Sequence, residues 1–402
     1  MVMTQSFLPN AAIAWSRVFA LAGMQGAIIL SWVMYRLYLP DLFAQAGLAP
    51  SVVGTVLLFE VAIAFVLEPL MGYGSDQLRY WTGTRFPLIL GAVLLTAVMF
   101  FALPPIAGLG PIAQSVLPLA AVIWAMAMAA FRSPILVMLA QCAIASDLPY
   151  AAGALMAVGA LAGRLIPLAN DFWLAHGVIA TFAIGSIVLL IAIAVLGQTL
   201  PPPAPPATTP PRISPRHLLV ALLRMVAVAI GVVWSGAFFG ALITALYTGV
   251  EPAPWINSHP IQVGVVGAMS CLIAAALGQR FGMRPVVTIA ASIAITAFLG
   301  RSISGTLAIG SLLTLVIVVV QNVINVGVIP LAIEIAPAGF GGVAIGMYFG
   351  TLGLAGKMFE QLFPDLSGTS PLGLAQAGAL TIAIVALGFG WGLWRKVPVT
   401  PS

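Results

Sequence analysis

The chain has 402 residues, of which 61% are hydrophobic and only 6% are charged, and its mean hydropathy is +1.13. About a quarter of the residues in a soluble domain are charged, so this composition excludes a soluble globular protein and indicates many membrane-spanning helices. The net charge of +5 comes from basic residues scattered through short loops. Such scattering favours membrane topology over a nucleic-acid partner as the explanation.

Twelve apolar stretches along the chain are each long enough to cross a bilayer as a helix. We expect them at residues 14–38, 51–73, 86–107, 116–142, 151–170, 173–198, 218–247, 261–279, 285–303, 306–333, 340–362 and 371–394. The first lacks a basic segment before it and a small-residue cleavage site. We therefore expect an uncleaved helix rather than a signal peptide.

Basic residues at the ends of these stretches predict the orientation of the chain. Arg36 and Arg301 fall on one face, whereas the other face carries Arg79, Arg85, Arg212, Arg216, Arg280, Arg284, Arg395 and Lys396. Cytoplasmic loops are enriched in Lys and Arg, and an even number of spans places both termini on one side. We expect a multi-pass protein of the inner (plasma) membrane with both termini in the cytoplasm.

A proline-rich segment divides the chain nearly in half. We expect a six-helix bundle at 1–199, a cytoplasmic linker at 200–217 and a second six-helix bundle at 218–402. The linker favours extended polyproline geometry and serves either as a spacer or as a docking site for an adaptor domain. The second half repeats a loop of the first in AALGQRFGMRP, which contains Arg284 and has Gln279 where the first loop has an acid. Paired bundles of this kind hold substrate between the halves near the membrane midplane.

The most informative segment is the polar break GYGSDQLRYWTGTRFP, at residues 72–87, between the second and third apolar stretches. It resembles the loop between helices 2 and 3 of the major facilitator superfamily, and most closely that of the sucrose and glycoside–cation symporters, through Gly72, Asp76, Gly83, Arg85 and Pro87. The resemblance implies an all-α membrane fold of twelve helices in two bundles. It also implies that Asp76, Arg85, Gly72 and Gly83 take part in gating. In that family the acid lies beside the start of the eleventh span and latches the halves in the outward-facing state.

Glu60 is the candidate for the coupling site, because it lies about ten residues into the second stretch and an ionisable side chain in the hydrocarbon region is costly. A buried carboxyl suits a proton carrier; a sodium ligand, a static ion pair and a protonated carboxyl packed between helices are the alternatives. Resemblance to melibiose-type carriers implies that acids on helix 2 serve the coupling cation. The further acids of that family on helices 1 and 4 are absent, which favours a proton over sodium.

Five further ionisable residues within the spans are candidates for an internal ion pair or for the solute pathway. Glu68 and Arg132 are expected to form a structural ion pair between the second and fourth spans, and Lys357 is expected to pair with Glu360, three residues along the same helix. A gate or pocket role is the alternative for this second pair. Arg164 either binds an anionic or hydroxyl-rich substrate or neutralises Glu60 across the bundle.

Neutral polar and aromatic side chains within the spans are candidates to bind a hydroxyl-bearing or amphipathic solute. They are Gln25, Trp32, Trp234, Gln321, Asn322 and Asn325. Amides also hold transmembrane helices together, so packing is the alternative for each amide. Tyrosines near span ends are expected to be interface anchors, namely Tyr35, Tyr38 and Tyr247. Glycines are expected to let helices approach and slide, notably Gly153, Gly159, Gly163, Gly346, Gly350 and Gly353.

The sequence contains no phosphate-binding glycine loop, no Ser–His–Asp set and no metal-ligand constellation, so we expect neither an enzyme nor a cofactor. We expect a monomeric secondary transporter that moves a small polar organic solute, sugar- or glycoside-like, with a proton by alternating access. The alternative is a non-transporting pigment-handling factor like the bacteriochlorophyll-delivery branch, with Gln25 or Asn322 as axial ligand. A carrier requires a wet, polar cavity, whereas a pigment handler requires an apolar groove.

Overall fold

The computed structural model describes residues 13–168, 170–203, 205, 215–246, 260–303 and 307–390. These residues form twelve α-helices, which satisfy their backbone hydrogen bonds internally as the bilayer requires. Their bounds are α1 Trp15–Gln45, α2 Pro50–Thr82, α3 Phe86–Ala107, α4 Ala113–Val137, α5 Leu148–Leu168, α6 Asn170–Thr199, α7 Pro215–Leu246, α9 Pro260–Phe281, α10 Met283–Ile303, α11 Leu307–Ile335, α12 Gly341–Leu362 and α13 Pro371–Gly390. Short 3₁₀ turns flank α4 at Gly110–Ile112 and Met138–Gln141.

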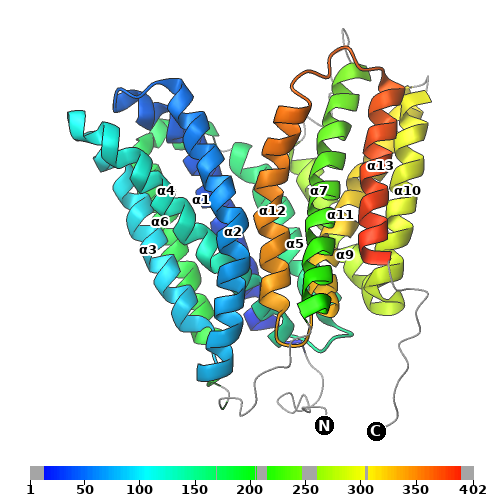
Figure 1. Cartoon of the computed structure of the whole chain (residues 1–402), viewed down its shortest axis with the longest axis horizontal. Helices are drawn as coiled ribbons and strands as arrows, with labels where there is room; N and C mark the ends of the chain where they lie inside the picture. Colours follow the sequence, from blue (N-terminus) through cyan, green and yellow to red (C-terminus); the bar gives the residue numbers. More distant parts are fainter. Residues whose placement is uncertain are drawn as a thin grey trace.

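The helices form two groups, α1–α6 and α7–α13, which lean apart toward the top of the view in Figure 1. In the described residues, ten helical segments are long and apolar enough to cross a membrane, so the chain is a multi-pass membrane protein. Within the first group α1 packs on α5 and α6, and α3 packs on α4 and α6; within the second α13 packs on α7 and α10. The groups meet mainly along two seams, α2 with α12 and α5 with α9.

The α2–α12 seam depends on glycines of α12 that contact the backbone of α2. A Cβ atom on Gly346 would lie 2.3 Å from the Glu68 carbonyl oxygen, and one on Gly350 would lie 2.8 Å from that of Ala64. Carbon atoms cannot approach oxygen so closely, so a larger residue would push the helices apart. These contacts run from Gly342, at the start of α12, to Gly353 in its middle.

The α5–α9 seam, by contrast, holds the bundles together over the whole length of both helices. At one end Gly278 of α9 lies against Pro149 of α5, because a Cβ atom added to Gly278 would lie 3.2 Å from the Pro149 Cβ atom. At the other end Gly264 lies against Arg164 at the same distance. The first group is therefore continuous with the second on this side of the molecule.

The structure corrects the expected position of the polar break. Helix α2 continues to Thr82, so Gly72 and Asp76 lie inside the helix and the connection to α3 is only Gly83–Arg85. The helix contains Pro69 but continues past it to Gly83, which adopts φ 78° and donates its N–H to the Arg79 carbonyl oxygen over 2.9 Å. A helix ends where its backbone is capped, not where its apolar residues end.

Two further boundaries differ from expectation for the same reason. Helix α1 extends beyond residue 38 to Gln45, and α7 begins at Pro215, inside the expected linker. Proline is well tolerated in the first turn of a helix because its missing N–H is not needed there. The loop of the second half repeats the conformation of the first, since Gly282 has φ 83°.

Candidate functional site

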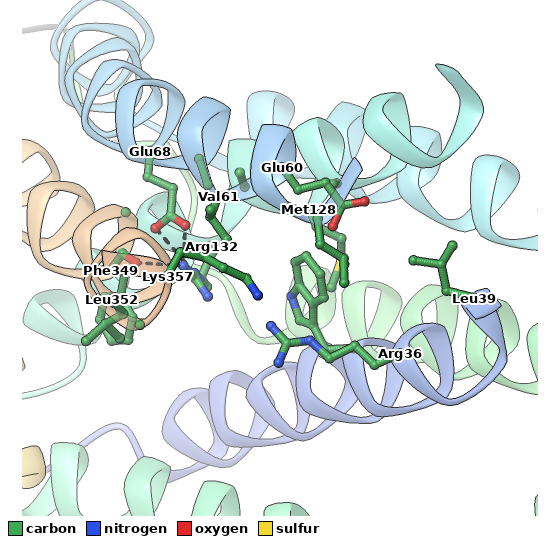
Figure 2. A pocket seen from close by; sticks show the side chains of 18 of the residues that line it. Arg36, Leu39, Glu60, Val61, Glu68, Met128, Arg132, Phe349, Leu352 and Lys357 are labelled. Carbon is green, nitrogen blue, oxygen red and sulfur yellow. Dashed lines mark hydrogen bonds and ion pairs between the residues drawn. The ribbon is translucent and has the colours of Figure 1, made fainter. Parts of the chain in front are cut away.

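A cavity of about 510 Å³ lies between α1, α2 and α4 of the first bundle and α12 of the second. Figure 2 shows it from close by. Its charged lining consists of three cations and three acids, namely Arg36, Arg132, Lys357, Glu60, Glu68 and Glu360. A volume of roughly 300–1,000 Å³ is typical of small-molecule sites, so the cavity is large enough for a metabolite.

Helical spacing explains why these residues share one cavity. Glu60, Ala64 and Glu68 recur at four-residue intervals on α2, and Trp32 and Arg36 are one turn apart on α1. Glu60 and Glu68 are separated by about 12 Å along the helix axis, from a rise of about 1.5 Å per residue. The cavity therefore has an upper level at Glu60 and a lower level at Glu68.

At the upper level, Glu60 is buried and accepts a hydrogen bond from the Tyr35 hydroxyl. The Tyr35 ring stacks on Trp124, with ring centroids 4.1 Å apart, and Trp124 also contacts Trp32 at 4.9 Å. Arg36 lies near enough to Glu60 to interact with it electrostatically. Glu60 thus lies between an aromatic cluster and a cation. Both act on its carboxyl and so affect whether that group holds a proton.

The prediction that Tyr35 and Tyr38 anchor the protein at the membrane interface is wrong. Tyr35 is fully buried against Glu60 and Trp124, and Tyr38 is buried with its hydroxyl 3.4 Å from the Thr181 hydroxyl. Because α1 continues past residue 38, neither tyrosine stands at the end of its helix. The third, Tyr247, lies outside the described residues.

At the lower level, the expected pair between Glu68 and Arg132 is confirmed. Arg132 also donates to the Phe349 carbonyl oxygen of α12 over 3.1 Å, and its guanidinium lies 5.3 Å from the Phe349 ring. The Ser133 hydroxyl donates to the Glu68 carbonyl oxygen over 2.9 Å. Figure 2 shows this group at the junction of α2, α4 and α12, so one ion pair links both bundles at the floor of the cavity.

The second expected pair is also confirmed, since Lys357 Nζ lies 2.6 Å from Glu360 Oε2. Both side chains line the cavity from α12, and they are 32% and 65% exposed. Lys357 and Glu360 therefore form the expected ion pair and also belong to the pocket wall, which was the alternative position for them. An exposed pair of this kind contributes little stability by itself.

Arg36 is a cavity residue that sequence reasoning assigned only to membrane topology. Its guanidinium lies 5.7 Å from the Trp32 ring and makes no hydrogen bond or ion pair within the described part of the chain. The usable signal was its spacing, one turn beyond Trp32 on an otherwise apolar helix. A lone arginine at the outer end of a span is more often an anchor, which is why the signal was missed.

Arg164 does not neutralise Glu60 in this structure. It is exposed on α5, and its stem contacts Gly264 of α9 at the other seam, away from the cavity lining. The hypothesis of a Glu60–Arg164 pair was wrong because it placed two residues at one depth without knowing which face of α5 turns toward α2. Arg36 is the cation that acts on Glu60.

Of the expected substrate-binding residues, Trp32 lines the cavity and the others do not. Trp234 donates its Nε1–H to the Ala355 carbonyl oxygen over 2.9 Å, and the Gln321 amide donates to the Ser235 hydroxyl over 3.3 Å. Asn322 donates to the carbonyl oxygen of Val318 over 3.0 Å. These side chains bond to helices of their own bundle, as do amides that hold transmembrane helices together. The remaining members of the set lie on α1 and α11, namely Gln25 and Asn325.

Beyond the floor of the cavity, Asp76 closes the seam between α2 and α12. It accepts a hydrogen bond from Arg85 and another, over 3.0 Å, from the backbone N–H of Gly342. Asp76 therefore lies beside the start of α12, where the resemblance placed it, and its charge faces a helix N-terminus. In the second half Arg284 lies 3.0 Å from Glu334 of α11 instead, since Gln279 replaces the acid.

The site contains no feature of a metal centre, since the described residues form no group of three or more His, Cys, Asp or Glu that could hold an ion. Its chemistry is that of charged and aromatic side chains around a solute-sized space. It offers one buried carboxyl, one unpaired guanidinium and two ion pairs.

No protein-family model matches the sequence, and no curated protein matches it significantly. Solved structures match the fold over nearly the whole chain. The human organic anion transporter MFSD10 (TETRAN) has a TM-score of 0.70 at 14% identity, covering 94% of this chain and 99% of that one. The proton:xylose symporter XylE bound to 6-bromo-6-deoxy-D-glucose has a TM-score of 0.68 at 14% identity, covering 96% of each chain.

A bacterial homologue of the iron transporter ferroportin, in an outward-facing state, has a TM-score of 0.73 at 12% identity. The match covers 96% of this chain and the whole of that one. At these identities the likeness shows the fold alone. The chain has the major facilitator fold, and the expected all-α architecture of two six-helix bundles is confirmed.

Proposed function

We propose that this protein is a secondary transporter that moves a small polar organic solute together with a proton by alternating access. The observation that carries the proposal is the position of Glu60, a buried carboxyl that lines a solute-sized cavity between the two bundles. An ion drives transport only if it binds one conformation better than the other. A carboxyl at the cavity wall meets that condition, because closing the bundles changes its surroundings.

The lining of the cavity favours a carrier over a pigment handler. Six charged side chains line it, whereas a pigment groove requires an apolar wall and an axial ligand. Gln25 and Asn322, the candidate axial ligands, lie outside the lining. A sugar- or glycoside-like solute is supported by the resemblance of the loop at residues 72–87 to the sucrose and glycoside–cation symporters.

The end of the molecule that carries Asp76 is the proposed cytoplasmic end. Arg79, Arg85 and Arg284 lie at this end, which agrees with the enrichment of basic residues on the cytoplasmic side. Here α2 contacts α12, whereas the cavity extends toward the end of α1 and the start of α2. The conformation corresponds to an outward-facing state in the plasma membrane.

Proteoliposomes containing Glu60→Gln test the proposal. Glutamine keeps the shape of the protonated carboxyl but cannot release a proton, so we expect this variant to lose uphill accumulation and to retain counterflow. Uptake of a panel of labelled sugars and glycosides, driven by an imposed pH gradient, measures the first; exchange without a gradient measures the second. Asp365→Asn, in an exposed loop, is the matched control and should behave as the unmodified protein.

Continued accumulation by Glu60→Gln under a pH gradient would refute proton coupling through this residue. Loss of counterflow as well would indicate instead that Glu60 has a structural role in the bundle. If no member of a broad solute panel moved through the unmodified protein by either assay, the transporter proposal itself would fail.

A further inference from the structure

We infer that Arg36 binds the carboxylate of an acidic solute, with Trp32 as the wall beside it. This inference rests on the proposed transport function, but it replaces the uncharged sugar or glycoside that the loop at residues 72–87 favours with an organic anion. Two of the three cations have an acid of their own: Arg132 binds Glu68, and Lys357 binds Glu360.

Arg36 is the third cation, and it has no hydrogen-bonding or ion-pair partner among the residues that the structure describes. Glu60, the cavity acid with which Arg36 interacts electrostatically, instead accepts its hydrogen bond from Tyr35. A guanidinium offers five N–H donors in a planar fork that matches the two oxygens of a carboxylate. An exposed, uncommitted guanidinium at a cavity wall is therefore a ready site for an anion.

The aromatic cluster holds this guanidinium in place. Arg36 lies 5.7 Å from the Trp32 ring, a distance at which the cation is attracted to the ring face. Trp32 in turn packs against Trp124, which is fully buried. Because the support is rigid, less freedom is lost when a ligand binds, and this preorganisation favours affinity.

The rest of the upper cavity suits the body of such a solute. Figure 2 shows Arg36 on α1 facing α2, with Val61 and Met128 across the space from it, while Leu352 lies beside Phe349 at the opposite side of the cavity. These side chains contribute apolar surface, while the carboxylate binds at one edge. The charge and the apolar wall together favour a monocarboxylate over an uncharged polyol.

The same arrangement connects anion binding to the proton. The groups facing Arg36 and Glu60 are Tyr35 on α1 itself, Glu68 on α2, Arg132 on α4, and Lys357 with Glu360 on α12. Each of the two ion pairs has no net charge, so the net charge of the cavity lining depends on Glu60 and Arg36 alone. A proton on Glu60 leaves Arg36 as the uncompensated charge, which a carboxylate then neutralises. Proton and anion therefore enter together with no net charge.

Matched pairs of acid and neutral solute test this inference. We would use lactate and lactamide, gluconate and glucose, and phenylacetate and phenylacetamide, with the purified full chain in lipid nanodiscs. We expect at least one carboxylate to raise the melting temperature and its neutral partner to need at least tenfold higher concentration for the same shift. Arg36→Gln should remove this preference, and Arg36→Lys should retain part of it, because lysine keeps the charge without the fork. Arg164→Gln, an exposed arginine away from the cavity, should keep the full preference.

Equal response to acids and neutral partners, including no response to either, would overturn the inference. So would an Arg36→Gln variant that still prefers the carboxylate. Both results leave the transporter proposal standing if labelled neutral solute is still accumulated under a pH gradient. Failure of transport for every solute, with carboxylate binding at Arg36 intact, would instead refute the transporter proposal alone.

Discussion

At the scale of single residues, the ion pair of Glu68 and Arg132 shows how charge is kept inside the membrane. Glu68 is only 1% exposed, and removing its partner would leave an uncompensated buried carboxylate. Arg132 donates hydrogen bonds to Glu68 of the first bundle and to the Phe349 carbonyl oxygen of the second, so it contacts both bundles at once. The pair therefore stabilises the first bundle and its contact with α12.

We expect Arg132→Gln to destabilise the protein by no more than about 3 kcal/mol. Breaking a fully buried pair costs about 3–5 kcal/mol, and the Arg132 side chain is 23% exposed to the cavity, which reduces the loss. Adding Glu68→Gln to this variant should recover part of the stability, since no charge is then stranded. Thermal unfolding of the purified single and double variants measures both effects, and additive losses would contradict the pair as a unit.

At the scale of helices, the glycines of α12 set how closely it approaches α2. Gly346 is the glycine of α12 at which an added Cβ would come closest to α2, 2.3 Å from a carbonyl oxygen. We expect Gly346→Ala to separate the two helices at the Asp76 end and to cost about 1–3 kcal/mol, the usual penalty for overpacking. Distances between spin labels on the exposed faces of α2 and α12 would lengthen.

Gly74 is the matched control for that experiment. It lies on α2 near the same end of the molecule, and an added Cβ there would meet nothing within 4 Å. Gly74→Ala should leave both the spin-label distances and transport unchanged. Unaltered distances in Gly346→Ala would show that the seam adjusts without opening, contrary to our expectation.

At the scale of the whole molecule, we propose that Asp76 biases which end of the cavity is closed. We expect Asp76→Asn to weaken its contact with the N-terminus of α12, worth up to about 2 kcal/mol in partly buried sites. Each 1.4 kcal/mol is tenfold in population, so the inward-facing state should gain by up to about thirtyfold. Labelling of introduced cysteines at the two ends of the cavity measures the shift, and transport should fall.

The fold of Asp76→Asn should remain intact, as its unfolding temperature and helical content would report. Unchanged cysteine labelling together with unchanged transport would remove the proposed latch. A loss of helical content would show that Asp76 instead supports folding through Arg85.

The sequence predicted the features that depend on composition and local spacing. Twelve apolar runs predicted the helices. The high free-energy cost of an unpaired charge in the bilayer predicted that Glu68 and Arg132 form a pair. Lys357 and Glu360 followed from a three-residue spacing on one helix. Each of these requires only the order of residues along the chain and a charge that needs a partner.

Rotations of helices about their own axes could not be predicted in this way. Arg164 and Arg36 were both isolated arginines in spans, and only the packing of α5 on α9 and of α1 on α2 decides which one faces Glu60. Tyr35 was misassigned because the end of α1 was placed seven residues too early, at residue 38 rather than Gln45. The extension of α2 to Thr82 moved Asp76 from a loop into a helix for a similar reason.

The two seams cover unequal shares of their helices, and this difference bears on how the bundles are expected to move. The α5–α9 contacts run from Pro149 to Arg164, nearly the full length of α5, whereas the α2–α12 contacts leave the first turns of α2 free, so we expect the bundles to rotate about α5 and α9. Displacement grows with distance from such an axis, so α2 and α12 must travel furthest while α5 and α9 merely pivot. Entry to the cavity is therefore from the end at which α2 and α12 separate, and the residues met first there are those of α1, α2 and α12.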